Sequence, residues 1–194
     1  MSTIYTLNSK VLKNTANDKW LIKKPVLPAD EVQIGNQIWK NKNMDIDDGQ
    51  GGITSVNIGV LNGYDYGTQY FYTVPAAERI AATLGNGWRL ATYYDWANLC
   101  TYVRNDGKTV MDLRTTTGYP EGYNGSDYYG FGLLMPGMSD GRSVGTKGYY
   151  WTSTIEQEQY NRYMQLYYNT TPTTFNYGYT TGTRQLYSIR LVKD

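Results

Sequence analysis

Two segments of the chain carry apolar residues at helical spacing, which predicts two amphipathic helices. The first covers residues 74–84 after a capping Thr73. The second follows Thr92 and ends near Arg104, and Thr92 with Asp95 resembles a capping box, in which each side chain satisfies a free backbone amide. The residues predicted to face the core are Val74, Ala77, Ile80, Ala81 and Leu84 in the first helix, and Trp96, Leu99, Cys100 and Val103 in the second.

The first half of the chain also contains strand-like segments. Residues 32–39 are expected to form a hairpin that turns at Gly35-Asn36, because both residues tolerate the positive φ of a tight turn. A short strand over residues 70–72 precedes the first helix. Residues 49–67 are predicted to be rich in loops, with one short apolar segment at 56–61.

After Gly107 the chain becomes rich in Tyr, Thr, Asn and Gly, and 13 of its 21 tyrosines lie from Tyr119 onward. Apolar and polar residues alternate there, which is typical of a sheet with one face on the core and the other in water. The fold class is therefore α+β. Short strands are predicted around residues 129–135, 148–154, 160–168, 173–177 and 185–192.

The alternation assigns side chains to faces in two of these strands. In residues 160–168, Met164 and Leu166 share one face, whereas Tyr163, Gln165 and Tyr167 share the other. In residues 185–192, the alternating apolar positions are Tyr187, Ile189 and Leu191, and the residues between them are Ser188 and Arg190.

Composition excludes several classes of function. The 194 residues include no histidine, so Ser-His-Asp and Cys-His nucleophile pairs and His-ligated metal sites are ruled out. The single cysteine, Cys100, cannot form an intrachain disulfide and reads as a core residue. The net charge is +1 with no basic stripe, which argues against nucleic acid as a partner. No apolar run is long enough to span a bilayer and no secretory signal is apparent, so we expect synthesis in the cytoplasm without export by the usual route.

Residues 1–31 differ from the rest of the chain. Lysines alternate with apolar residues, and Pro25 and Pro28 favour an extended linker. One interpretation is a flexible tail; the other is an arm that attaches the protein to a particle or to sister subunits. Trp20-Leu21-Ile22 favours the arm, because disordered tails seldom contain tryptophan.

Three carboxylates lie close together in residues 45–48. Asp45, Asp47 and Asp48 precede Gly49 and offer oxygen ligands of the kind that calcium prefers. No glutamate stands where an EF-hand would place its bidentate ligand, and acidic turns are common. The sequence leaves a calcium ion there as an open question and assigns no metal site or cofactor.

Four segments together resemble the Fibrobacter succinogenes major paralogous domain, a relative of the C-type-lectin-like and formylglycine-generating-enzyme folds. They are IGNQIW at 34–39 with residues 41–44, GWRLAT at 87–92 with Asp95, Trp96 and Leu99, GYYWTST at 148–154, and SIRLVKD at 188–194. The resemblance spans residues 32–194 and implies a C-type-lectin-like fold, with two helices packed on twisted antiparallel sheets with long loops. The Glu-Pro-Asn and Trp-Asn-Asp calcium signatures of lectins are absent, so it implies a fold more than a chemistry.

The leading functional hypothesis is a non-enzymatic binding module on the surface of a bacteriophage virion, as a head or tail decoration or fibre. The implied fold is similar to that of phage tropism proteins, whose variable patch lies in C-terminal strands and loops. Host-surface glycans or proteins would be the ligands, because aromatic faces stack on sugars and amides bond hydroxyls. The predicted ligand-binding residues are Tyr160, Asn161, Tyr163, Gln165, Tyr167, Asn169, Tyr177 and Tyr179.

Other interpretations of the same residues stay open. The tyrosines can instead pack against each other and cover the sheet, in a purely structural capsid or tail component or in a bacterial surface protein. The protein is expected to be oligomeric and to contact other virion proteins through residues 1–31. An enzyme would need a carboxylate pair such as Asp127 with Asp140, or Glu121 with Glu156, and no spacing singles one out.

Overall fold

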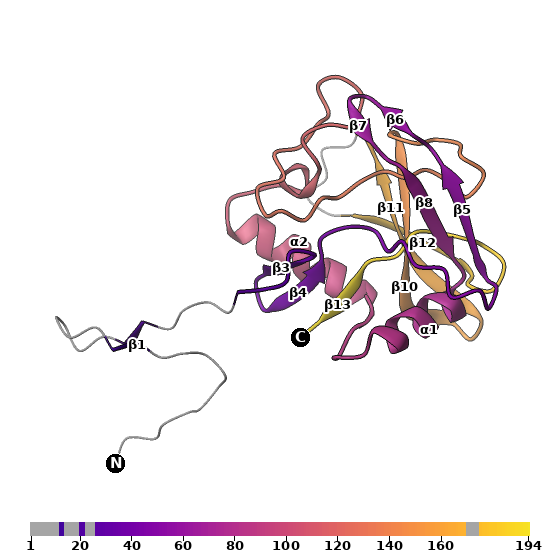
Figure 1. The fold of residues 1–194 in the computed structure, drawn as a ribbon, viewed down its shortest axis with the longest axis horizontal. Helices are drawn as coiled ribbons and strands as arrows, with labels where there is room; N and C mark the ends of the chain where they lie inside the picture. The colour runs from indigo at the N-terminus through magenta and orange to yellow at the C-terminus, as the bar shows by residue number, and fades with distance from the viewer. Residues whose placement is uncertain (1–11, 14–19, 22–25, 170–174) are drawn as a thin grey trace, which may run out of the picture.

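The computed structural model describes residues 26–169 and 175–194, together with the backbone of two short antiparallel strands, β1 (Leu12–Lys13) and β2 (Trp20–Leu21). The side chains of Trp20 and Leu21, and all of Ile22, lie outside the described residues, so the predicted attachment site stays a prediction. The described part of the chain is a mixed α+β structure with two α-helices and several antiparallel sheets (Figure 1).

Four antiparallel sheets build the domain after residue 26. The four-stranded sheet has the order β3-β4-β13-β9, and the three-stranded sheet has the order β10-β11-β12, whereas β5 pairs with β8 and β6 pairs with β7. The bounds are β3 (Glu31–Ile34), β4 (Gln37–Lys40), β5 (Ile53–Asn57), β6 (Val60–Leu61), β7 (Tyr64–Asp65), β8 (Thr68–Tyr72), β9 (Arg89–Leu90), β10 (Lys147–Gln157), β11 (Tyr160–Tyr167), β12 (Asn176–Thr181) and β13 (Leu191–Lys193).

The predicted hairpin is confirmed as β3 and β4. Ile34 pairs with Gln37, and Gly35 turns the chain with a φ of 63°. The sequence underestimated the order in residues 49–67, where β5, β6 and β7 form. These strands are short and place few residues in the core, so their apolar pattern is weak.

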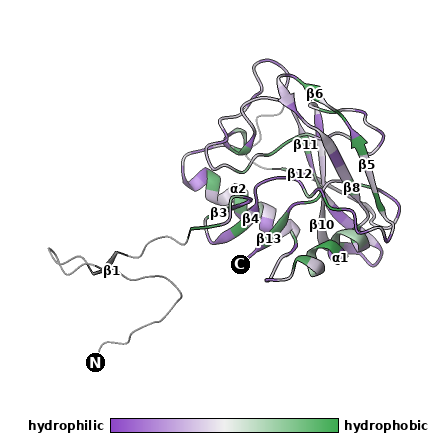
Figure 2. Cartoon of the chain, viewed as in Figure 1, coloured by the Kyte–Doolittle hydropathy of each residue, from purple (hydrophilic) through white to green (hydrophobic). Residues whose placement is uncertain are grey.

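Both predicted helices are confirmed as α1 (Val74–Leu84) and α2 (Tyr93–Asn105). Thr73 caps α1, and Thr92 with Asp95 forms the predicted capping box of α2. Both helices show apolar and polar residues in Figure 2. Every residue predicted to face the core is buried except Leu84, which is half-buried at the last turn of α1.

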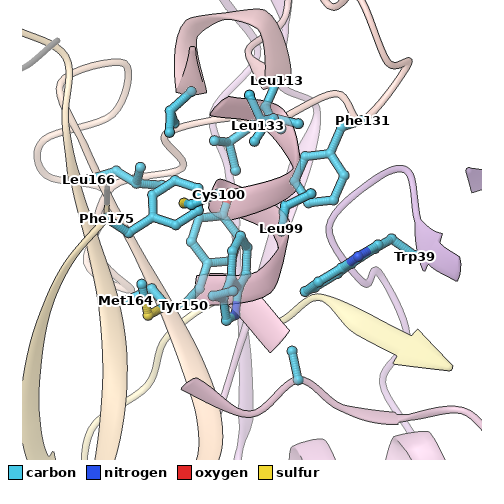
Figure 3. Close-up of a cluster of buried hydrophobic side chains, with 14 of the residues drawn as sticks. Trp39, Leu99, Cys100, Leu113, Phe131, Leu133, Tyr150, Met164, Leu166 and Phe175 are labelled. Carbon is cyan, nitrogen blue, oxygen red and sulfur yellow. The ribbon is translucent and has the colours of Figure 1, made fainter. Parts of the chain in front are cut away.

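The larger core cluster joins α2 to the C-terminal sheet. Cys100 is buried there, as predicted, and lies on the side of Phe175, whereas Leu99 lies on the side of Phe131 and Trp39 (Figure 3). The Trp39 and Trp96 rings are 5.1 Å apart. The α2 helix is therefore held by aromatic packing as well as by aliphatic burial.

The prediction of a strand around residues 129–135 is wrong. This segment is irregular, although Phe131, Leu133 and Met135 are fully buried. Leu133 forms only an isolated β-bridge with Arg114, and side chains bond two carbonyls of the segment: Tyr119 Oη donates to Leu133 O at 2.7 Å, and Tyr150 Oη donates to Leu134 O at 2.7 Å. Burial produced the apolar pattern that is typical of a strand, while the isolated bridge and side-chain donors bond the backbone in place of a continuous strand.

The alternation in residues 185–192 does not separate a wet face from a core face. Ser188 and Arg190 are both fully buried, because the segment passes between two layers: Tyr187 bridges Tyr72 of β8, and Ser188 bridges Tyr150 of β10. The guanidinium of Arg190 donates to the carbonyls of Lys40, Phe131 and Gly132 and to Asn43 Oδ1. The strand predicted over 173–177 is observed as β12, which begins later, at Asn176; residues 170–174 lie outside the description.

Candidate functional site: an aromatic surface on the C-terminal sheet

The register of β11 and β12 divides the predicted ligand-binding residues between two faces of one sheet. Met164 pairs with Tyr177, and Tyr163 pairs with Gly178. Directly opposed residues point to the same side of a sheet, so Tyr177 shares the face of Met164, and Tyr163 lies on the other face. Tyr160, Tyr177 and Tyr179 fall on the first face; Asn161, Tyr163, Gln165 and Tyr167 fall on the second.

The first face carries a cluster built around Arg162. The Arg162 guanidinium lies 4.6 Å from the centre of the Tyr93 ring and 4.8 Å from that of Tyr177. Tyr94 packs edge-on against Tyr93 at 5.5 Å, and Tyr179 packs edge-on against Tyr160 at 6.1 Å. We call this the aromatic surface, defined by Tyr93, Tyr94, Tyr160, Arg162, Tyr177 and Tyr179.

Three rings of the aromatic surface are open to solvent. Tyr94 is 69% exposed, Tyr179 is 53% exposed and Tyr177 is 50% exposed. These are among the most exposed large hydrophobic side chains in the described residues. Tyrosine at a surface offers a rigid ring and a hydroxyl at low entropic cost, which is why it is common in recognition sites.

The charge at the centre of the surface is neutralised locally. Arg162 Nε donates a short hydrogen bond to Glu156 Oε2. This hydrogen bond raises the pKa of Arg162 and lowers the pKa of Glu156, so both groups stay ionised and paired near neutral pH. The surface consequently presents rings and hydroxyl groups with no net charge from its one ion pair.

The N-terminus of α2 fixes Tyr93 in this cluster. Tyr93 N donates to Thr154 Oγ1 of β10 at 2.9 Å, which ties the helix to the C-terminal sheet. Asp95 accepts hydrogen bonds from Thr92 N, from two nitrogens of Arg89 and from Gln37 Nε2. Burial alone would raise the pKa of Asp95, but the Arg89 and Thr92 hydrogen bonds outweigh it and lower that pKa.

On the second face of the sheet, most of the predicted ligand-binding residues pack against other side chains. Tyr163 lies 4.9 Å from Tyr187 and 6.1 Å from Trp151, ring centre to ring centre. Gln165 Nε2 donates to Tyr167 Oη at 2.6 Å, and both side chains are half-buried. Asn161 is half-buried as well, and only Asn169, after the end of β11, is exposed among the predicted residues outside the first face.

Sequence reasoning missed Tyr93, Tyr94 and Arg162. Arg162 is two residues from Met164 in β11, so the period-2 pattern does place it on the core-facing side of the strand. A charged residue at such a position, in the segment Tyr160-Asn161-Arg162-Tyr163, was the available signal. The contribution of Tyr93 and Tyr94 comes from a different element, and strand patterns carry no information about it.

Each of the three carboxylates in residues 45–48, which the sequence left open as calcium ligands, has a partner within the protein. Asp48 binds Arg79 through two hydrogen bonds of 2.5 and 3.0 Å, which lower the pKa of Asp48 to about 2. Asp45 pairs with Lys42 at 2.8 Å, and Asp47 accepts from Gly49 N. Within residues 26–169 and 175–194, no group of three or more His, Cys, Asp or Glu side chains is arranged to hold a metal ion.

Most of the other candidate reactive groups have partners or are buried, whereas Glu121 is exposed. Asp140 pairs with Arg142, and Glu156 pairs with Arg162. Asp127 accepts from Gly132 N, and burial raises its pKa. Burial raises the pKa of Cys100 to about 11, which keeps the thiol protonated and a poor nucleophile.

No helix among the described residues is long and apolar enough to cross a membrane.

The fold and this surface define a mixed α+β domain that carries an organised aromatic patch on its C-terminal sheet. The chain matches the model of the Fibrobacter succinogenes major domain family over residues 32–193. The protein belongs to this family, as the four sequence segments predicted. No curated protein and no solved structure matches the chain.

Proposed function

We propose that this domain is a non-enzymatic binding module whose ligand contacts the aromatic surface. The observation that carries the proposal is the gathering of three exposed tyrosines, Tyr94, Tyr177 and Tyr179, around the ordered Arg162. Exposed rings held by their neighbours lose little entropy on binding, and contact residues of this kind tend to dominate binding energy.

The chemistry of the surface suits a host-surface glycan or a protein. The hydrogens along a sugar ring pack on tyrosine faces, and tyrosine hydroxyls exchange hydrogen bonds with sugar hydroxyls or peptide groups. The Arg162–Glu156 ion pair leaves no unpaired charge at its centre, which favours a ligand without strong net charge.

The proposal extends to fold and location. A C-type-lectin-like fold is supported by the family resemblance and by two helices packed beside antiparallel sheets. Display on a bacteriophage virion is supported by the likeness of that fold to phage tropism proteins. The arm at residues 1–31, with Trp20-Leu21-Ile22, precedes the family domain and would attach the protein to the particle, with oligomers as the expected form.

A glycan-array and cell-surface binding screen on the purified protein tests the ligand. The Tyr177→Ala/Tyr179→Ala double variant should lose at least about tenfold in affinity for any ligand found. Tyr128→Ala is the matched control, because Tyr128 is 59% exposed and is not part of the aromatic surface. Equal binding by the double variant and the wild type would contradict the proposal.

Two alternatives give different results in the same experiments. A purely structural capsid or tail component would bind no host ligand but would depend on residues 1–31 for incorporation into particles. A bacterial surface protein would bind ligands without entering particles. Deleting residues 1–25, which keeps β3 and the ion pairs of Asp30 and Glu31, should abolish particle incorporation while the domain stays folded. Normal incorporation of the truncated protein would rule out the attachment arm.

A further inference from the structure

A polar cleft lies away from the aromatic surface, between the segment that follows β4 and the β7–β8 region. It has a volume of about 220 Å³, and no residue of the aromatic surface lines it. The wall residues that matter for its chemistry are Lys42, Asn43, Asp45, Tyr64, Tyr66 and Gln69.

The base of the cleft is held by a chain of hydrogen bonds that starts at a buried arginine. Arg190 Nε donates to Asn43 Oδ1 at 2.9 Å, and Asn43 Nδ2 then donates to Gln69 Oε1 at 3.2 Å. Gln69 Nε2 donates in turn to the carbonyl of Tyr66 at 2.5 Å. The charge of Arg190 fixes the orientation of both amides, so the base is preorganised before any ligand arrives.

The wall of the cleft includes the side chain of Tyr64. Tyr64 is half-buried, and its hydroxyl has no hydrogen-bond partner among the residues that the structure describes. Its ring is held edge-on against Tyr66, with ring centres 5.3 Å apart. Burial raises the pKa of Tyr64, so the hydroxyl remains a donor at neutral pH. An apolar ring edge and a free hydroxyl therefore meet in one position.

The rim of the cleft is a balanced ion pair. Lys42 Nζ and Asp45 Oδ2 are 2.8 Å apart, and the side chains are 58% and 50% exposed. Two neighbouring hydroxyl groups of one ligand can donate to Asp45 and accept from Lys42 without separating the pair. A charged ligand would have to compete with the pair, which disfavours ions and zwitterions.

We infer that this cleft binds a single neutral sugar ring, with the hydroxyls on the Lys42–Asp45 pair and on Tyr64, and the ring hydrogens against the Tyr64 ring. The volume supports one ring, because it is below the roughly 300–1,000 Å³ of sites for drug-sized ligands and larger than a few waters of about 30 Å³ each. The inference does not depend on the aromatic surface binding a ligand.

Saturation-transfer NMR with the full chain and free glucose, galactose, mannose or N-acetylglucosamine tests the inference. At least one sugar should bind with a dissociation constant of about 1 mM, as expected for a ligand this small. Thr68→Trp places a large ring in the cleft and should abolish binding; tryptophan is well accepted in strands. Tyr64→Phe removes one hydrogen bond, and Asp45→Asn removes the charge and one of the two acceptor oxygens, so each should weaken binding about threefold to tenfold.

The controls distinguish binding in this cleft from binding elsewhere on the protein. Tyr128→Phe and Glu121→Gln change the same groups outside the cleft and should leave sugar binding unchanged. Sugar binding that survives Thr68→Trp, or that disappears instead in Tyr177→Ala/Tyr179→Ala, would overturn the inference. So would binding of none of the four sugars, or competition by free glycine. If Thr68→Trp does not fold, the exposed Asp45 variant still decides the question.

Discussion

Two groups of tyrosines on the same sheet have opposite roles. Tyr163 of β11 packs with Trp151, Tyr149 and Tyr187 on one face, whereas Tyr177 of β12 lies half exposed on the other. The two residues are in adjacent strands and have the same chemistry. Strand register places the two rings on opposite faces, because a shift of one residue moves a side chain to the opposite face. The face alone does not decide exposure, since Met164 is buried on the face that Tyr177 shares.

The comparison also shows what organises each group. The inner group, Tyr149, Trp151, Tyr163 and Tyr187, is held by mutual ring contacts, including the stacked Tyr149–Tyr187 pair at 5.1 Å. The aromatic surface is held around an arginine and an adjacent helix terminus. The inner group should therefore contribute to stability, and the aromatic surface to binding.

The largest expected effect is on the inner group. Trp151→Ala removes a fully buried ring whose Nε1 donates to Tyr72 O at 2.7 Å, and it should lower the free energy of unfolding by about 3–5 kcal/mol. Urea unfolding measures this loss. A loss of less than about 1 kcal/mol would mean that the inner group contributes little to the stability of the fold.

The next effect is at Asp95, which caps the helix terminus that carries Tyr93 and Tyr94 of the aromatic surface. Asp95→Asn weakens the capping box and the ion pair with Arg89, and it should cost about 2 kcal/mol at pH 7. The folded-state pKa of Asp95 is below its unfolded value of about 3.9, so the stabilisation is complete above that pH and is lost as pH falls through the folded pKa. Thermal melts from pH 7 to 2 should show a shallower acid loss in Asp95→Asn; an unchanged slope would contradict this assignment.

A smaller effect is expected at the centre of the aromatic surface. Arg162→Met removes two cation–π contacts and the ion pair with Glu156, all partly exposed, and should cost only about 1 kcal/mol. Ligand affinity should nevertheless fall, because Tyr93 and Tyr177 lose the group between them. Arg162→Lys keeps the charge and should recover stability more than affinity. If Arg162→Lys recovered ligand affinity as fully as stability, Arg162 would not act by positioning Tyr93 and Tyr177.

The sequence anticipated the parts of this molecule that local patterns control. Helix α1 was predicted with its bounds, and the alternation of Met164 and Leu166 with Tyr163 in β11 is confirmed. Both depend on residues close in sequence. The burial of Arg190 was not anticipated, because it depends on carbonyls of residues 131 and 132 that no local pattern brings near.

The candidate site was predictable only in part for the same reason. Tyr160, Tyr177 and Tyr179 were assigned to it and do lie together, but Tyr163 and Tyr167 were grouped with them and lie on the other face. The face of a β12 residue depends on its register against β11, and the composition of a tyrosine-rich strand carries no register. Tyr93 required a contact between elements 84 residues apart, Tyr93 and Tyr177.

The smallest expected change in stability is at Tyr177 and Tyr179, and it is the sharpest test of the comparison. Both rings are half exposed, so the Tyr177→Ala/Tyr179→Ala variant should change the free energy of unfolding by only about 0.5–1 kcal/mol. Measured beside Tyr163→Ala, which opens a gap against Trp151 and Tyr187, the double variant should be the more stable protein despite losing two rings. Urea unfolding of both decides the order. If the double variant were the less stable, the exposed tyrosines would be structural, and the case for a binding surface would lose its basis.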